Sequence, residues 1–477
     1  MAQAESAPSG SAPPAESARQ ARRHGVNIFE EGKPMWQILL VFLVPLMLSN
    51  ALQSASQTFA SIWIGRLIST EALGAVSAVF PVVFLLFSFV FGVSSGGTVL
   101  VGQAFGAKDY HRLKRISGTV LGAALYLGII VAVVGYFGST AMLAWLRTPA
   151  DIIGMADAYA KVIFLVMPMF FVYFVYATIL RGTGDSTTPF YALIVSSVLA
   201  IVITPLFIVG WLGLPKLGVV SAAVAGLIAN TAALAWMIVY LRVRDNPLKF
   251  DREMLADFAI DFKILWSVLK IGVPTGIQVM MVSLAELAVI SFVNSFGSSA
   301  TAAYGAVNQI VGYVQFPAIS IGISASIFGA QCIGARREDK LGSVIRSAVG
   351  LNYVVGGVLI ALCYIFAWVI LGWFITDPHT LDIAHELLMI TLWSYAIFGN
   401  SAVLSGVMRG SGDVLWPTAI SIFTIWGIEV PVAWFLMQRI GLDGVWLGYP
   451  AAYCASLLLQ FCYYEFVWKR KTHERLA

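Results

Sequence analysis

Two acidic residues lie deep within long apolar stretches of this chain. Glu286 falls in the apolar run at 267–294, and Glu429 directly precedes Val430-Pro431. A charge at the centre of a bilayer costs about 2.5–3.5 kcal/mol on insertion scales, so such a residue is a functional candidate by default. Apolar surroundings also raise the pKa of a carboxyl group, which allows proton exchange near neutral pH. We therefore predict ion or proton coupling at Glu286 and Glu429.

A structural role is the alternative for both acids. Glu286 could serve as a buried hydrogen-bonding group, and Glu429 could pair with backbone carbonyls that Pro431 leaves without a donor. Uncharged polar side chains also interrupt the apolar runs, and such groups avoid lipid. They line a water-filled cavity or bond helix to helix. The candidates for cavity lining are Asn50, Gln53, Gln57, Gln278, Asn308 and Gln309.

The composition places these residues in a membrane protein. The chain has 477 residues, of which 59% are hydrophobic and 11% charged, and its mean hydropathy is +0.84. Soluble proteins carry about 25% charged residues. Spanning helices need about 20 mostly apolar residues. We predict twelve of them, at 38–64, 73–101, 116–138, 160–180, 190–210, 219–241, 267–294, 302–330, 346–374, 385–407, 416–436 and 444–468.

A long internal repeat divides these helices into two sets of six. The pattern R-G-[ST]-G-D-x-x-x-P occurs at 181–189 and again 228 residues later at 409–417. A repeat of this length is one folding unit that has been copied. Because six is even, both copies begin on the same side of the membrane. The predicted fold is an all-α polytopic membrane protein whose two parallel six-helix repeats are related by a pseudo-two-fold axis along the membrane normal.

The repeated motif itself has a structural explanation. Its glycines allow a tight reversal, its aspartate can cap the next helix, and its arginine ends the preceding helix on the positive side. The predicted structural-turn residues are Arg181, Gly184, Asp185, Arg409, Gly412 and Asp413. Prolines at matching places in the two halves predict helix kinks, which serve packing or conformational switching. They are Pro45, Pro205, Pro274 and Pro431.

The positions of the basic residues predict the orientation. With the N-terminus inside, only Arg66, Arg147, Lys161, Lys216 and Arg439 of the 29 lysines and arginines lie outside. Basic residues collect on the cytoplasmic side, so we expect both termini there. The predicted segments are a disordered cytoplasmic tail at 1–35, six-helix bundles at 36–242 and 267–468, a cytoplasmic linker at 243–266 and a tail at 469–477.

Several function classes lack support. The chain has no G-x-x-x-x-G-K-[ST] sequence, no aspartate-rich metal motif and no H-E-x-x-H, so we expect no nucleotide-driven pump, no enzyme, no cofactor and no metal site. Its basic residues follow the topology, so we expect no nucleic-acid partner. We expect a monomer whose partners are small molecules and the lipid bilayer.

At this point the chain resembles a known family. Two parallel six-helix halves, the repeated R-G-[ST]-G-D motif, G-Q-A-F-G-A-K-D at 102–109 and L-G-V-V-S-A-A at 217–223 are similar to the multidrug and toxic compound extrusion (MATE) family over about residues 36–468. The resemblance implies a secondary antiporter in the bacterial inner membrane. It would export amphipathic, often cationic, compounds by alternating access in exchange for H⁺ or Na⁺.

The chain departs from the family at acidic positions. Members commonly carry Asp where this chain has Ala60, and Asn and Asp where it has Ala200 and Thr204. A glutamate of some branches would fall at Val282, one helical turn before Glu286. The resemblance therefore places coupling in the C-terminal half, at Glu286.

Two alternatives of function remain open. A lipid-linked oligosaccharide flippase or polysaccharide exporter of related fold usually lines its cavity with several basic residues, and the predicted spans hold few. A membrane enzyme or receptor would need a buried ligand cluster, and none is visible in the sequence.

Overall fold

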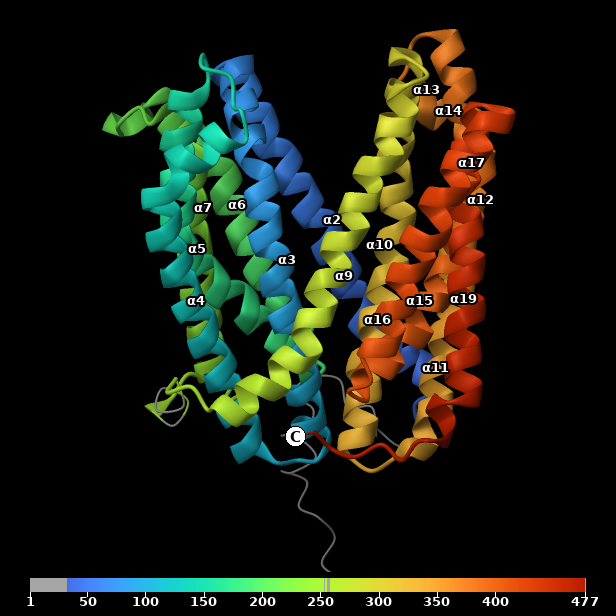
Figure 1. Ribbon diagram of the computed structural model, residues 1–477. Helices are drawn as coiled ribbons and strands as arrows, with labels where there is room; N and C mark the ends of the chain where they lie inside the picture. Colours follow the sequence, from blue (N-terminus) through green and yellow to red (C-terminus); the bar gives the residue numbers. More distant parts are fainter. Residues whose placement is uncertain (1–31, 253, 255–257, 477) are drawn as a thin grey trace, which may run out of the picture.

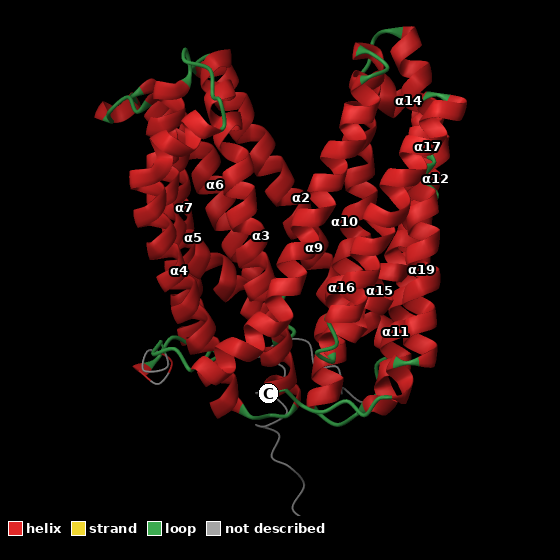
Figure 2. Ribbon diagram, viewed as in Figure 1, coloured by secondary structure: helices red, strands yellow, loops and turns green. Residues whose placement is uncertain are grey.

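The computed structural model describes residues 32–252, 254 and 258–476. Every regular element in this part of the chain is helical (Figure 2). The predicted tail at 1–35 lies outside the described residues except for its last four positions, and α2 begins at Met35. Eleven described helices are long and apolar enough to cross a membrane, and α14 with α15, bent by 42°, makes a twelfth span. The predicted all-helical membrane fold is confirmed.

The helices of the first half are α2 (Met35–Leu67), α3 (Thr70–Gly106), α4 (Tyr110–Trp145), α5 (Ile153–Gly182), α6 (Thr187–Val209) and α7 (Ser221–Val243). Those of the second half are α9 (Phe262–Asn294), α10 (Ser298–Gly334), α11 (Leu341–Leu351), α12 (Gly357–Ile365), α13 (Ala367–Gly372), α14 (Pro378–Thr391), α15 (Ser394–Gly410), α16 (Leu415–Thr424), α17 (Val430–Ile440), α18 (Leu442–Trp446) and α19 (Gly448–Phe466). Two π-helical turns lie between them, η4 (Asn352–Gly356) and η5 (Ile425–Glu429).

Four spans predicted as continuous helices are interrupted in the second half, one of which, at 444–468, is divided between α18 and α19. The span at 346–374 contains η4, the span at 416–436 contains η5, and the tenth span is the bent pair α14 and α15. At η4 the cause is a buried amide. Asn352 Nδ2 donates to the Ala396 carbonyl at 2.9 Å and to Asn400 Oδ1 at 3.0 Å. A side chain bonded so closely to a neighbouring helix holds an extra residue in its own turn.

The two bundles form a V (Figure 1). They converge at the end that carries the C-terminus, and they diverge toward α13 and α14. We call these the closed end and the open end. The α3–α4, α5–α6, α10–α11 and α15–α16 connections all lie at the closed end.

The first helix of each half crosses into the opposite bundle. The start of α2 packs in an apolar cluster of the second half, where Phe42 and Phe328 have ring centroids 5.3 Å apart. The start of α9 packs in the main cluster of the first half through Val268 and Ile271. Figure 1 shows the two helices running diagonally between the bundles. Each core is therefore completed by the other repeat.

Glycines allow α3 and α9 to approach closely. A Cβ atom at Gly92 would overlap the Gly272 carbonyl oxygen, and one at Gly96 would overlap the Val268 carbonyl oxygen. Small residues at helix interfaces allow close backbone packing in membranes. This contact joins the two halves at the closed end.

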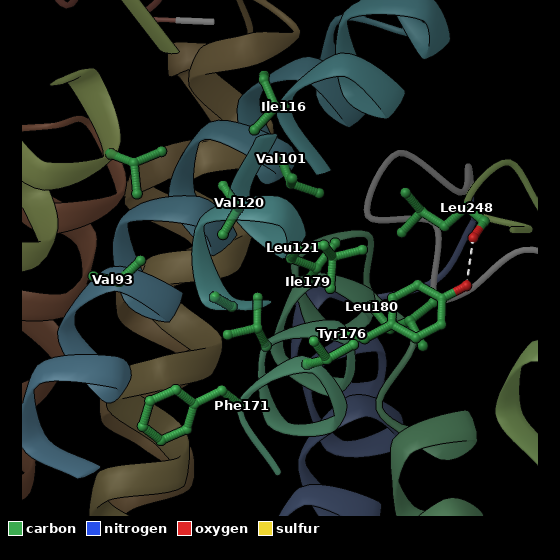
Figure 3. Packing of buried hydrophobic residues seen from close by; sticks show 14 of the residues in the cluster. Val93, Val101, Ile116, Val120, Leu121, Phe171, Tyr176, Ile179, Leu180 and Leu248 are labelled. Carbon is green, nitrogen blue, oxygen red and sulfur yellow. Dashed lines mark hydrogen bonds between the residues drawn. The ribbon is translucent and has the colours of Figure 1, made fainter. Parts of the chain in front are cut away.

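The connection between the halves is docked on the first bundle. Tyr176 donates its hydroxyl to the Leu248 carbonyl at 2.6 Å, next to the apolar core shown in Figure 3. Lys114 Nζ pairs with Asp251 Oδ2 at 2.7 Å. Phe258 packs partly buried against the same core. The predicted linker at 243–266 thus contributes to the packing of the first half.

Candidate functional site

The two intramembrane glutamates lie close together in the second bundle. Glu286 is on the part of α9 toward the open end, and Glu429 is the last residue of η5. Glu429 is 5% exposed, whereas Glu286 is exposed. Their carboxyl groups are near enough for their charges to interact. An exposed glutamate therefore lies beside a buried one.

A break in a helix places Glu429 at this position. The α-helical pattern of α16 gives way to a π-helical turn, and Pro431 follows in the first turn of α17. Proline cannot donate to the preceding turn, and π-helical turns are frequent at functional sites. Trp426, on the same turn, donates its Nε1–H to the Met281 carbonyl of α9 at 3.1 Å. This bond fastens the turn that carries Glu429 to the helix that carries Glu286.

Neither carboxylate has a partner in its own bundle. Among the residues that the structure describes, no hydrogen bond or ion pair joins Glu286 or Glu429 to another group. The structural alternative for Glu429, pairing with carbonyls freed by Pro431, is therefore not formed here. A carboxylate near another carboxylate and without a bonded donor is suited to take up a cation or a proton.

Tyrosines surround the carboxylates. The hydroxyls of Tyr304 and Tyr449 are 2.9 Å apart, and the Tyr304 ring stacks on Trp446 with 7° between the planes. Tyr304 and Tyr395 lie within electrostatic range of both glutamates. The sequence did not reveal these residues, because a tyrosine in an apolar run has the same pattern as a core aromatic.

Polar residues of α9 and α10 lie near Glu286 and Tyr304 in the sequence of these helices. Asn308 and Gln309 are exposed on α10, and Asn308 reaches the Tyr304 hydroxyl. Gln278 lies two turns before Glu286 on α9. Its Oε1 is buried and has no partner within the described part of the chain. These three predicted cavity residues thus lie on the helices that carry Glu286 and Tyr304.

The predicted cavity residues of α2 do not all share one environment. Asn50 Nδ2 donates to Ser320 Oγ of α10 at 3.0 Å, which bonds the two halves together. Gln53 is half-buried and Gln57 is exposed. Both alternatives for this face are therefore present, bonding between helices at Asn50 and an open surface at Gln57.

The first copy of the turn motif has the expected local geometry. Gly184 has a φ of +87°. Asp185 Oδ1 accepts from the amides of Thr187 and Thr188 at 3.1 and 2.9 Å, as a helix cap does. Arg181 lies in the last turn of α5.

The second copy differs at its aspartate, and the expected cap is not formed. Asp413 Oδ2 accepts from the Tyr463 hydroxyl at 2.7 Å and from Lys471 Nζ at 2.8 Å, while α16 begins without a side-chain cap. The carboxylate is drawn away because a hydroxyl and an ammonium group lie within reach. Gly412 has a φ of +91°, and Arg409 lies in the last turn of α15.

A pair of glutamine side chains ties the two motifs to the opposite halves. Gln103 Nε2 on α3 donates to the Gly410 carbonyl at 3.1 Å, and Gln331 Nε2 on α10 donates to the Gly182 carbonyl at 2.9 Å. The two glutamines are separated by the repeat distance of 228 residues, and so are the two glycines that accept from them. Gln103 Oε1 also accepts from the Leu476 amide at 2.8 Å. We call the two equivalent bonds the glutamine braces, and they lie at the closed end.

The four prolines predicted to kink helices lie inside spans. Pro45, Pro205 and Pro274 stand within continuous α-helices, whereas Pro431 follows a π-helical turn. The matched pair in the fifth span of each half, Pro205 and Pro431, therefore has different local structure in the two halves.

The first half has no counterpart of the glutamate pair at the corresponding positions. Thr204 is buried, and its hydroxyl donates to the Ala200 carbonyl of the same helix at 2.6 Å. Ile203 stands at the position that corresponds to Glu429 in the repeat, and Ala60 stands where family members commonly carry an aspartate in the first helix. Among the described residues, no group of three or more His, Cys, Asp or Glu could hold a metal ion.

Comparison with known proteins places this geometry in a family. The MatE family model matches residues 45–206 and 274–435, two segments that reproduce the internal repeat. The chain is 51% identical to the probable multidrug resistance protein YoeA of Bacillus subtilis (strain 168), over 94% of this chain and 97% of that protein. It is 25% identical to the multidrug export protein MepA of Staphylococcus aureus (strain MSSA476), over 87% and 90%.

Solved structures share the fold. A Vibrio cholerae MATE transporter, VcmN, superposes with a TM-score of 0.83 at 18% identity, over 96% of this chain and 99% of that one. An outward-facing multidrug resistance MATE transporter superposes with a TM-score of 0.82 at 21% identity, over 89% and 94%. The two segments that the family model matches together make up about two thirds of the chain. The resemblance predicted from the sequence is therefore confirmed: the chain belongs to the MatE family of multidrug and toxic compound extrusion proteins.

Proposed function

We propose that this protein exports amphipathic, including cationic, small molecules across the bacterial inner membrane in exchange for H⁺ or Na⁺. The names of its relatives, a multidrug resistance protein and a multidrug export protein, support the substrate class. Family membership also favours a transporter over a membrane enzyme or receptor. The main support for cation coupling is the pair of Glu286, which is exposed, and Glu429, which is buried. Both lie on the side of the second bundle toward the open end.

The charge distribution supports an orientation for the V. Lys108 and Arg336 lie at the closed end with the C-terminus, whereas Arg66 and Arg147 end helices at the open end. Basic residues prefer the cytoplasmic side. The closed end is then cytoplasmic, and the V faces outward.

The proposed exchange cycle uses this geometry. From the outside, a proton or Na⁺ reaches Glu286 and relieves the repulsion between the two carboxylates. The relieved site lets the second bundle pack more tightly at its open end, and the bundles close there as the glutamine braces separate. On the inside, where the cation is released, the carboxylates regain their charge and can bind a cationic compound, which the return step carries outward.

An apolar pocket supports binding of the apolar part of such compounds. It measures about 430 Å³, within the usual range for small-molecule sites, and lies between α3, α4, α5 and α9. It is lined by Leu85, Leu86, Ser88, Phe89, Leu127, Val131, Phe171, Val273, Gly276, Ile277 and Met280.

Transport by purified protein in liposomes tests the proposal. A fluorescent cationic dye is followed while a pH or a sodium gradient is imposed. We expect one of the gradients to drive dye movement in the wild type, and the driven component to be lost in Glu286→Gln. Glu465→Gln removes an exposed carboxylate that pairs with Lys469 and serves as the matched control. Gradient-driven transport that is unchanged in Glu286→Gln would overturn the assignment.

A further inference from the structure

A small, partly open cavity lies between the two bundles near the closed end. It measures about 90 Å³, and both halves contribute to its wall. The residues around it are Phe91, Ser94, Ser95, Thr98, Val99, Thr178, Arg181, Thr275, Gly322, Ile323, Ser326, Ile327 and Arg409. The two arginines are the equivalent residues of the repeated motif, and Thr98 and Ser326 are separated by the same 228 residues.

No acidic side chain balances the arginines. Within the described chain, neither Arg181 nor Arg409 forms an ion pair, and no Asp or Glu lines the cavity. The aspartates of the same motifs are engaged elsewhere. Asp185 caps α6, and Asp413 pairs with Lys471.

Several donors in the cavity wall are also free. Arg181 Nε and Ser94 Oγ are buried and have no hydrogen-bond partner among the described residues. Ser94 is only 1% exposed. Thr98, by contrast, donates to the Ser94 and Thr178 carbonyls. The wall therefore offers guanidinium and hydroxyl donors and two uncompensated positive charges.

Physical chemistry favours a counter-anion in such a place. Buried charges are found paired, because removal of an ion from water without a partner costs several kcal/mol. Two like charges in the wall of one small cavity also repel each other. A guanidinium group presents parallel N–H donors that match the oxygens of a carboxylate or a phosphate.

We propose that a small phosphate-type oxyanion binds between Arg181 and Arg409 and bridges the two halves. The cavity is too small for an acyl chain, and the glutamine braces lie between it and the closed end, so we assign the site to free phosphate. Because each half supplies one arginine, the site is complete only when the closed end is closed. The anion therefore favours the conformation described here over one in which the bundles separate at this end.

The site is independent of the drug and of the coupling cation. It explains why both copies of the repeated motif carry arginine, which a turn alone does not require. Its failure would leave the proposed function intact, because Glu286 and Glu429 lie toward the other end.

Direct binding of inorganic phosphate tests the proposal. Purified protein in nanodiscs of phosphatidylcholine is dialysed against radiolabelled phosphate at constant ionic strength. We expect saturable binding of one phosphate per protein, competition by sulfate, and a Kd at least about tenfold higher in Arg181→Gln and in Arg409→Gln, since each loses a charge-assisted hydrogen bond. Arg244→Gln, which removes an exposed arginine of the same end, should bind as the wild type does.

Three outcomes would overturn the proposal. They are a wild type without saturable binding, Arg→Gln variants that bind as tightly as the wild type, and loss of phosphate binding when phosphatidylglycerol is added to the nanodiscs. The last would assign the oxyanion to a lipid headgroup. Should a variant not fold, the sulfate competition on the wild type still decides whether an oxyanion site exists.

A distance measurement tests the conformational consequence. Spin labels at Trp211→Cys and Trp373→Cys, exposed positions at the open end of the two bundles, are placed in a background without native cysteines. We expect phosphate to increase the long-distance population in the parent protein and not in Arg409→Gln. An equal response in both would contradict a bridging anion.

Discussion

Glu286 and Glu429 act on each other because they share one small region of the second bundle. Two carboxylates near each other are not easily both ionised, so the arrival of one cation or one proton affects both. Tyr304 of α10 and Tyr449 of α19, whose hydroxyls are 2.9 Å apart, lie beside this pair.

This coupling predicts a non-additive pair of substitutions. Glu286→Gln and Glu429→Gln should each reduce gradient-driven dye transport, and the double variant should be no slower than the slower single variant. Residues that act as one unit show this behaviour, whereas independent residues lose activity multiplicatively. Initial rates in liposomes provide the comparison, and a multiplicative loss in the double variant would show that the two carboxylates work separately.

At this scale the sequence predicts some residues and not others. Glu286 and Glu429 could be found because a charge within an apolar run is visible without a structure. The direction in which Arg181 and Arg409 point could not, since a helix end on the basic side looks the same whether its arginine faces water or a cavity. Gln103 and Gln331 did carry a signal, namely two glutamines at the repeat distance inside apolar helices.

Among the elements, α3 and α9 form the closest contact between the halves. Gly92 and Gly272 let their backbones touch. A methyl group at either position would force the helices apart, and overpacking of this kind typically costs about 1–3 kcal/mol.

Gly92→Ala should therefore shift the protein away from the closed arrangement of this end. In a background without native cysteines, Ser95→Cys should react faster with an impermeant thiol reagent applied to the closed end when Gly92→Ala is present. Gly138→Ala is the matched control, because no atom lies within 4 Å of a Cβ at Gly138. Equal reaction rates in the two variants would mean that the α3–α9 contact does not hold this end together.

The docked connection between the halves has a pH-dependent component. Partial burial opposes ionisation of Asp251, but hydrogen bonds from Lys114 and the Met254 amide outweigh it, so the pKa of Asp251 lies below its ordinary value. A lowered folded-state pKa gives stability that is present above the unfolded pKa of about 3.9 and is lost as the pH falls through the folded pKa.

Asp251→Asn should lower the thermal stability at neutral pH by about 1 kcal/mol or less, the range of partly exposed ion pairs. The difference from wild type should disappear once the pH falls below the folded pKa of Asp251. Thermal unfolding curves over a pH series measure this. Asp245→Asn, at the more exposed pair with Lys249, should have a smaller effect, and a difference that persists at the lowest pH would exclude the proposed cause.

Helix identity was predictable and helix continuity was not. Length and hydropathy identify twelve spans because a bilayer imposes both. The π-helical turns at Asn352 and Glu429 depend on tertiary contacts. The local sequence around Asn352 does not predict its hydrogen bonds to α15. The crossing of α2 and α9 into opposite bundles is likewise a property of packing between distant segments.

For the whole molecule, the repeat explains the symmetry of the closed end. The glutamine braces are equivalent bonds made in opposite directions, as at the interface of a two-fold dimer. The open end has no such bonds between the halves in the described chain. The molecule is therefore held at one end and free to separate at the other, which is the form expected of alternating access.

Site-directed labelling tests the orientation of this V. In a background without native cysteines, Trp145→Cys at the open end should react with an impermeant maleimide on intact cells, since Trp145 is 83% exposed. Arg244→Cys at the closed end should react only after the membrane is opened. The reverse pattern would place the closed end outside and would invert the direction of transport.

The crossing of α2 and α9 has a consequence for biosynthesis. When the first six spans have left the ribosome, the beginning of α2, with Phe42, lacks the apolar side chains of α10 against which it packs, because these are made later. The first bundle also lacks Val268 and Ile271 until α9 has been inserted. A nascent chain stopped after α7 would therefore present unfinished apolar faces to the insertion machinery, and maturation of both bundles has to wait for late segments of the message.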